Sequence, residues 1–322
     1  MKKFLILWLN QYWYRTKKPC FLLRPLAWVY FFCQQIDKLI KKPQKTRLPV
    51  IVVGNLTVGG TGKTPIVLAI YEYLTMQGKR VGIITRAYKN KLHNDVYLVQ
   101  KHDLASKIGD EAAMLAQKIT APIVISTNRA QAAEFLAQHD LCDIIISDDG
   151  LQHYSLASKI NIAVIDGARG FGNQSLLPIG PLREHKSRLN SVDFILINGP
   201  ISPQLSKQLN NYQEKTYSFV IKAQPLPPLE RPVAAFAGIG NPENFFRTLR
   251  EQNLEFKAYP FPDHHQYAQK DFEITENSII MTEKDAIKCH AINHKKIYAL
   301  AIEASIPDSF WQSFLKCMSL PS

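Results

Sequence analysis

The stretch VIVVGNLTVGGTGKTP, residues 50–65, decides the fold of this 322-residue chain. Its first residues are β-branched and apolar, which predicts a buried parallel strand over 50–53. The glycines that follow let backbone N–H groups face phosphate oxygens, and the helix predicted over 63–77 directs the positive end of its dipole to the same place. Glycine, lysine and threonine at 62–64 complete the pattern of a phosphate-binding loop. The stretch therefore predicts a nucleotide site between a strand and a helix.

The polar residues of this loop have expected roles. Lys63 would reach the β- and γ-phosphates, and Thr64 would hold Mg²⁺ through its hydroxyl. The residues expected around the nucleotide are Thr57, Gly59, Gly60, Thr61, Gly62, Lys63 and Thr64. The usual spacing has a glycine where this chain has Thr57, but the glycines at 59–60 still supply an adaptable backbone. The alternative, a glycine turn with an incidental lysine, is disfavoured by the strand before it and the helix after it.

Two carboxylates follow a second β-branched run. A strand is predicted over 143–147, and Asp148 and Asp149 come directly after it. Ligands of open parallel sheets bind at the carboxyl ends of the strands, so an acid here and Thr64 are expected to hold Mg²⁺ on the phosphates. A solvated turn before Leu151 is the alternative, and the phosphate loop favours the metal site.

Strands and helices alternate after residue 47. Further strands are predicted over 81–85, 122–125, 161–165 and 194–197, with helices starting at 109 and spanning 128–138. This alternation predicts an α/β fold of the P-loop NTPase type, with a mostly parallel sheet and helices on both faces.

A second region follows a set of prolines between residues 200 and 232. Strands are predicted over 233–237, 279–282 and 297–301, and Asn241 and Pro242 open a helix. The predicted organisation is an N-terminal helical segment over 1–46, a P-loop domain over 47–228 and a smaller α/β domain over 229–322.

Composition and charge exclude several classes of protein. Apolar residues make up 46% of the chain and charged residues 20%, which is typical of a folded globular protein. The five cysteines include no CxxC pair, which argues against a disulfide framework or a structural zinc site. Residues 1–47 hold eleven Lys and Arg and one Asp, a net charge of +10 out of +12, so the rest of the chain is nearly neutral.

The basic N-terminal segment is also aromatic. It contains Trp8, Trp13 and Trp28 and has apolar runs over 4–14 and 25–36, each shorter than the roughly 20 residues of a spanning helix. Aromatic rings mixed with cations suit a lipid interface, so a membrane-interfacial segment is the first interpretation. Packing of these aromatics onto the protein is the second, and a nucleic-acid-binding arm is a distant third.

Three other polar groups have open interpretations. Asp110 at a helix start is either a functional carboxylate or the cap of that helix. His264 and His265 could be a zinc ligand, a general base or surface residues, and zinc is improbable without a matching Cys set. Arg183 offers a fork that matches phosphoryl oxygens, whereas a surface ion pair with Glu184 is the alternative.

Seven sequence blocks occur in an order that carries a resemblance. The blocks are VGNLTVGGTGKTP at 53–65, GDEA at 109–112, DDGLQH at 148–153, PIGPLRE at 178–184, GIGNP at 238–242, DHH at 263–265 and TEKDA at 282–286. Taken together, they make the chain resemble the tetraacyldisaccharide 4′-kinase family of Gram-negative bacteria. The resemblance spans the whole length, including the aromatic N-terminus.

The resemblance implies an activity and a location. The family transfers the γ-phosphoryl group of ATP–Mg²⁺ to the 4′-hydroxyl of a tetraacylated glucosamine disaccharide 1-phosphate, which gives lipid IVA in the biosynthesis of lipid A and lipopolysaccharide. It works as a peripheral enzyme at the cytoplasmic face of the inner membrane. The implied partners are therefore the acylated disaccharide and the inner-membrane lipid surface, without nucleic acid.

The resemblance also implies roles for single residues. Asp110 and His264 would act together at the acceptor hydroxyl, with His265 the less suitable histidine. Arg183 would lie near the nucleotide and join Lys63 in neutralising the γ-phosphoryl group. The implied metal ligands are Thr64, Asp148, Asp149 and Glu184.

The chain departs from the family pattern in two places. Residues 85–89 are TRAYK, where the family usually has SRGYG. Both glycines of the family motif are therefore replaced, and the motif gives less support for a role of Tyr88 in substrate binding. His185 replaces the proline that usually follows the Arg-Glu pair. Two rival functions remain, a membrane-recruited NTPase switch that transfers no phosphoryl group to lipid and a nucleic-acid-binding protein. The near-neutral body of the chain argues against the second.

Overall fold

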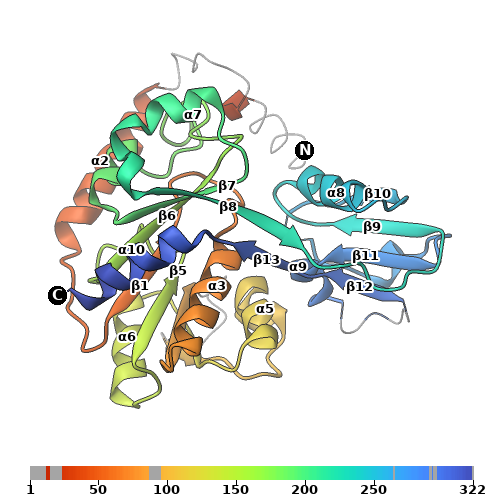
Figure 1. Ribbon diagram of the computed structural model, residues 1–322, viewed down its shortest axis with the longest axis horizontal. Helices are drawn as coiled ribbons and strands as arrows, with labels where there is room; N and C mark the ends of the chain where they lie inside the picture. Colours follow the sequence, from red (N-terminus) through yellow and green to blue (C-terminus); the bar gives the residue numbers. More distant parts are fainter. Residues whose placement is uncertain are drawn as a thin grey trace.

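The computed structural model of the chain describes residues 12–14, 24–86, 96–263, 265–289, 292 and 296–320. Within these ranges the chain forms a large α/β domain and a smaller one, with β8 and β13 running between them (Figure 1). The helices are α2 (Arg24–Ile40), α3 (Lys63–Met76), α4 (Ala105–Ile108), α5 (Asp110–Lys118), α6 (Arg129–Gln138), α7 (Pro203–Gln208), α8 (Pro242–Glu251), α9 (Glu283–Ala286) and α10 (Asp308–Ser319). The strands are β1 (Val50–Gly54), β2 (Val81–Arg86), β3 (Val96–Leu98), β4 (Ile123–Ser126), β5 (Ile144–Asp148), β6 (Ile160–Asp166), β7 (Phe194–Asn198), β8 (Thr216–Ala223), β9 (Val233–Ala237), β10 (Lys257–Pro260), β11 (Ser278–Thr282), β12 (Ile297–Leu300) and β13 (Ile302–Ser305).

The large sheet has nine strands in the order β13-β8-β7-β6-β1-β5-β2-β4-β3. Only the outermost pairs, β13 with β8 and β3 with β4, are antiparallel among the pairings of the described strands. The central strand β1 lies between β6 and β5, and Val53 pairs with Asp148 at the carboxyl ends of β1 and β5. This confirms the predicted mostly parallel sheet and places the phosphate loop beside the two aspartates.

Helices cover both faces of the large sheet because every residue of β1 and β5 is buried and each face needs an apolar cover. One face packs against α6 and α7 through residues such as Leu136 and Leu205. The other packs against α3, α5 and α10, with Ile70, Leu115 and Phe310 in a shared core. Both clusters run along the strands of the sheet and hold the helices against its two faces.

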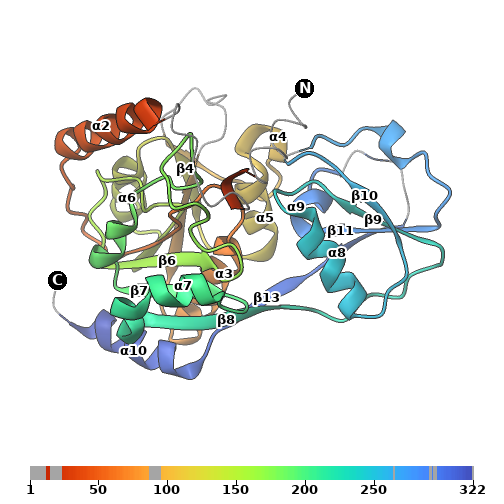
Figure 2. The same cartoon turned by 90° about the horizontal axis from the view of Figure 1, so that it is seen from above.

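The smaller domain is a four-stranded parallel sheet in the order β10-β9-β11-β12, which covers residues 233–300. The predicted boundary of 229–322 differs from the structure at its C-terminal end. There β13 pairs with β8, and α10 packs Phe310 and Phe314 into the core of the large domain. The chain therefore crosses from the large domain to the small one along β8 and returns along β13, as both views show (Figures 1 and 2).

The N-terminal region shows two kinds of packing. Trp13 is buried and donates its indole N–H to the carbonyl oxygen of Pro178 at 3.1 Å, as the core-packing interpretation expects. Helix α2 lies on the part of the large domain away from the small domain and has no buried residue (Figure 2). Its exposed apolar side chains are Leu26, Trp28, Val29, Phe32, Ile36, Leu39 and Ile40. Nowhere in the described ranges is a helix both long and apolar enough to cross a membrane.

Candidate active site

The phosphate loop connects β1 to α3 and is left open on the side where a ligand would lie. Gly59 and Gly62 have φ of +112° and +95°, in the left-handed region that side chains disfavour. Among the described atoms, none lies within 4 Å of the place where a Cβ on Gly60 would stand. Gly62 begins α3 without a side-chain cap, so the first N–H groups of the helix point into this space. The geometry of the loop therefore suits an anion.

Lys63, Asp149 and Arg183 form one charged cluster at the mouth of the loop. The Lys63 Nζ lies 3.3 Å from Asp149 Oδ1, and Arg183 Nη1 lies 2.9 Å from Asp149 Oδ2. Burial would raise the pKa of Asp149, but Lys63 and Arg183 outweigh it and hold that pKa far below its usual range. Asp149 is thus a fixed negative charge that holds two cations in place beside the loop.

The neighbouring Asp148 is in the opposite situation. Its side chain is buried, and neither carboxylate oxygen has a hydrogen-bond partner within the described part of the chain. Burial and then the charge of Glu111 raise the pKa of Asp148 to about 7. A buried carboxylate without partners is what a bound cation would satisfy. Asp148 is therefore better suited than Asp149 to bind a cation, and the hydroxyl of Thr64 at the start of α3 is the other suitable donor.

The donor set suits Mg²⁺ rather than a structural metal. No group of three or more His, Cys, Asp or Glu in the described residues is arranged to hold a metal ion. Mg²⁺ needs only one or two protein carboxylates, because waters and substrate phosphates supply its other ligands. Asp148 and Thr64 meet that requirement.

The loop before Arg183 is joined to the phosphate loop by backbone hydrogen bonds. The N–H of Val58 donates to Pro181 O at 2.8 Å, and the N–H of Arg183 donates to Leu56 O at 2.7 Å. These bonds fix the direction of the Arg183 side chain. Arg183 is therefore brought to the site as predicted, by a segment more than a hundred residues further along the chain.

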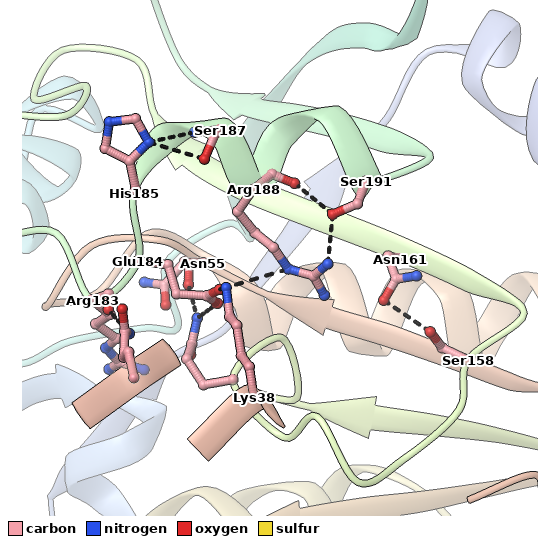
Figure 3. A network of polar contacts seen from close by, with 12 residues as sticks. Lys38, Asn55, Ser158, Asn161, Arg183, Glu184, His185, Ser187, Arg188 and Ser191 are labelled. Atoms are coloured by element: carbon pink, nitrogen blue, oxygen red, sulfur yellow. Dashed lines mark hydrogen bonds and ion pairs between the residues drawn. The ribbon is translucent and has the colours of Figure 1, made fainter. Parts of the chain in front are cut away.

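Glu184 points elsewhere than the predicted metal site. Its buried carboxylate pairs with Lys38 of α2 at 3.0 Å and accepts a hydrogen bond from Gln152 at 3.0 Å, with Arg188 at 3.8 Å (Figure 3). Two consecutive residues thus face different partners. Arg183 faces the phosphate loop, and Glu184 faces the N-terminal helix α2. In this arrangement Glu184 anchors α2.

The small domain closes the site from the other side. A Cβ placed on Gly240, after β9, would stand 3.3 Å from Asp263 Oδ2 and 4.0 Å from the backbone nitrogen of Gly60. The Asp-His-His segment therefore begins beside the phosphate loop. His264 itself lies outside the described residues, as does Tyr88. His265 bonds Asp271 at 3.0 Å through Nε2, which gives it a structural partner.

Asp110 lies at the boundary of the two domains. The helix cap is Gly109, which has no side chain, so Asp110 is not the cap that the alternative interpretation proposed. Its side chain is nearly buried, and Lys288 Nζ of the small domain lies 3.7 Å from Asp110 Oδ2. Lys284 bonds Glu111 at 2.9 Å. Burial would lower the pKa of Lys284, but Glu111, Asp263 and Asp110 together raise it, which places these carboxylates in one neighbourhood.

Three residues at the site were not assigned a role from the sequence. Glu111 lies within the GDEA block, and Lys288 follows the TEKDA block without belonging to it. Arg129 is wholly buried and donates to the carbonyl oxygens of Ser126 at 2.8 Å and Asp148 at 3.3 Å, with a third bond to Thr85. It thereby ties together the carboxyl ends of three strands. No local pattern marks a lysine or an arginine for such a position.

Comparisons with known proteins show which family the chain is similar to. The sequence model of a family described as "LpxK: Tetraacyldisaccharide-1-P 4'-kinase" matches residues 20–319. A Legionella pneumophila (strain Lens) protein named tetraacyldisaccharide 4′-kinase is 41% identical over 321 residues, 95% of each chain. One of that name from Methylobacillus flagellatus is 40% identical over 96% of this chain and 95% of its own. A crystal structure of "apo" form LpxK from Aquifex aeolicus in complex with ATP has a TM-score of 0.74 at 27% identity, covering 92% of this chain and 98% of its own.

Proposed function

The chain belongs to the tetraacyldisaccharide 4′-kinase family, and on that premise we propose that its phosphate loop and the residues around Asp110 carry out the family's reaction. In that reaction the γ-phosphoryl group of ATP passes to the 4′-hydroxyl of a tetraacyl glucosamine disaccharide 1-phosphate and gives lipid IVA. The protein is a phosphotransferase with an alcohol acceptor, and it acts in lipid A biosynthesis. The observation that carries the proposal is the convergence of Lys63, Asp149 and Arg183 at the open loop.

The large domain would bind ATP, the phosphoryl donor of the reaction. Backbone N–H groups of residues 59–62 and the Lys63 ammonium would bind the β- and γ-phosphates. Arg183 would neutralise charge on the transferring group. Mg²⁺, held by Thr64 and Asp148, would supply further charge neutralisation on the same phosphates. Asp149 keeps Lys63 and Arg183 beside the loop before ATP binds.

The acceptor side is assigned to Asp110 and His264. The Asp110 carboxylate would take the proton of the 4′-hydroxyl while that oxygen bonds to the γ-phosphorus and the bond from phosphorus to ADP breaks. His264 would orient or relay this proton. Support comes from the domain boundary, where Lys288 Nζ lies 3.7 Å from Asp110 Oδ2. The charges of Asp110 and of Asp263, the residue before His264, both raise the pKa of Lys284.

We also propose that α2 places the enzyme on the cytoplasmic face of the inner membrane, where a tetraacylated substrate lies. The exposed side chains of Trp28 and Phe32 would enter the lipid interface, and the basic charge of residues 1–47 would be drawn to anionic headgroups. Binding of this kind is peripheral and involves no nucleic acid.

Product analysis tests the proposal. The full chain is incubated with labelled ATP, Mg²⁺ and the tetraacyl disaccharide 1-phosphate in mixed micelles, and the glycolipid is analysed by mass spectrometry. If the protein is the kinase, the mass of the glycolipid increases by one phosphoryl group. Lys63→Ala is expected to abolish this mass increase while the fold stays intact. Release of free phosphate with an unchanged glycolipid would instead support the NTPase switch.

A further inference from the structure

Lys288 is a buried cation at the boundary of the two domains. Only 2% of its side chain is exposed, and it follows α9 of the small domain. Its Nζ lies 2.8 Å from Asp285 Oδ1 and 3.7 Å from Asp110 Oδ2 in the large domain. We propose that Lys288 is a positioning residue, which fixes the Asp110 carboxylate for its reaction with the acceptor hydroxyl. This inference rests on the proposed role of Asp110.

The small domain holds Lys288 rigidly. Asp285 is buried and accepts hydrogen bonds from the Gly238 N–H at 2.9 Å and the Thr282 hydroxyl at 2.7 Å, besides its contact with Lys288. The ammonium also lies 5.3 Å from the ring centre of Tyr267. A Cβ on Gly238 would stand 2.9 Å from Asp285 Oδ1, so only glycine allows this close approach. The cation is therefore fixed on the side away from Asp110.

Asp110 is held on its own side by the start of α5. Helix α5 packs against the small domain through Ile287, which is buried in one cluster with Ile108 and Ala112. The apolar contact sets the distance between the two domains at the point where Lys288 meets Asp110. The carboxylate then has a fixed helix behind it and a fixed cation beside it, which is the support that a reacting group needs from its surroundings.

A purely structural role is the competing explanation for Lys288. Burying an ammonium group is costly, and a buried ion pair is weak evidence for stability because desolvation offsets the attraction. An apolar side chain beside Ile287 would stabilise the interface at lower cost. The placement of a lysine between two carboxylates from different domains is better explained by the orientation of Asp110.

A double-mutant cycle on the full-length enzyme separates these explanations. Lys288→Met is expected to lower kcat about 100-fold and to change the KM for ATP less than about threefold, because a misplaced base slows the transfer step alone. Added to Asp110→Asn, the same substitution is expected to change the remaining rate less than about threefold, since it acts through Asp110. Lys118→Met is the matched control, because Lys118 also pairs across the two domains, with Glu283 at 2.7 Å, but lies at the opposite end of α5 from Asp110.

The outcomes are distinct. If Lys288→Met has the kcat of the wild type, the positioning role is overturned. It is also overturned if the double variant loses kcat by the product of the two single reductions. Wild-type kcat in Asp110→Asn overturns the proposed function itself and the inference with it. If thermal unfolding finds Lys288→Met unfolded, the near-isosteric Asp285→Asn replaces it. That variant is expected to lower kcat about tenfold in the wild type and to have no effect beside Asp110→Asn.

Discussion

The pH dependence of metal-assisted ATP binding tests the assignment of Asp148. Burial and the charge of Glu111 raise its pKa to about 7, so the carboxyl is largely protonated at pH 6 and largely ionised at pH 8. A cation binds the ionised form, so its affinity falls as the pH drops through 7. The ionised fraction changes about tenfold between these two pH values, which corresponds to about 1.4 kcal/mol of binding free energy.

Asp148→Asn is the control that isolates this effect. The phosphates of ATP titrate in the same pH range, but they titrate alike in both proteins. Binding of a fluorescent ATP analogue with Mg²⁺ is measured from pH 6 to pH 8, and the ratio of wild-type to Asp148→Asn affinities is compared. The ratio is expected to rise about tenfold with pH. A constant ratio would mean that Asp148 has an ordinary pKa or does not face the cation, and the reasoning from its buried oxygens would be refuted.

Three further substitutions probe the phosphate loop, the exposed apolar side of α2 and the domain boundary. Gly62→Ala should weaken ATP binding and cost about 1–2 kcal/mol in urea unfolding, because its φ is +95° and its Cβ would stand 2.9 Å from Asn198 Nδ2. Replacing Trp28 and Phe32 together by serine should reduce sedimentation with anionic vesicles and change stability by less than about 0.5 kcal/mol, since both are exposed. Phe310→Ala should cost about 3–5 kcal/mol in the unfolding of the large domain, because α10 belongs to its core.

The donor side of the site follows from local sequence. Residues 50–65 contain the strand, the glycines and the helix start next to one another, and each element forms where its pattern predicts. Asp148 follows its strand directly, and the rule that parallel strands end at one edge is enough to bring it to the loop. Arg183 is the exception on this side, because tertiary contacts bring it to the loop from a segment more than a hundred residues further along the chain.

The acceptor side depends on contacts between distant segments. Lys288 and Asp110 are far apart in the sequence, and they meet because β8 and β13 carry the small domain to α5. The return of the chain along β13 was itself missed, because four residues at 302–305 give too short a pattern to show alternation. A sequence pattern locates a side chain within its own element, whereas the pairing of domains is set by tertiary packing.

Glu184 shows how adjacent residues acquire different functions. Arg183 is bonded through its backbone to Leu56 and directs its guanidinium at Asp149, beside the phosphate loop. The chain bends at residues 183–184, and the next side chain points toward Lys38 of α2. The Tyr30 hydroxyl of α2 also donates to the carbonyl oxygen of Arg183 at 2.9 Å. The same short segment therefore joins α2 to the residue beside the phosphate loop, so the position of Arg183 depends on how α2 is docked.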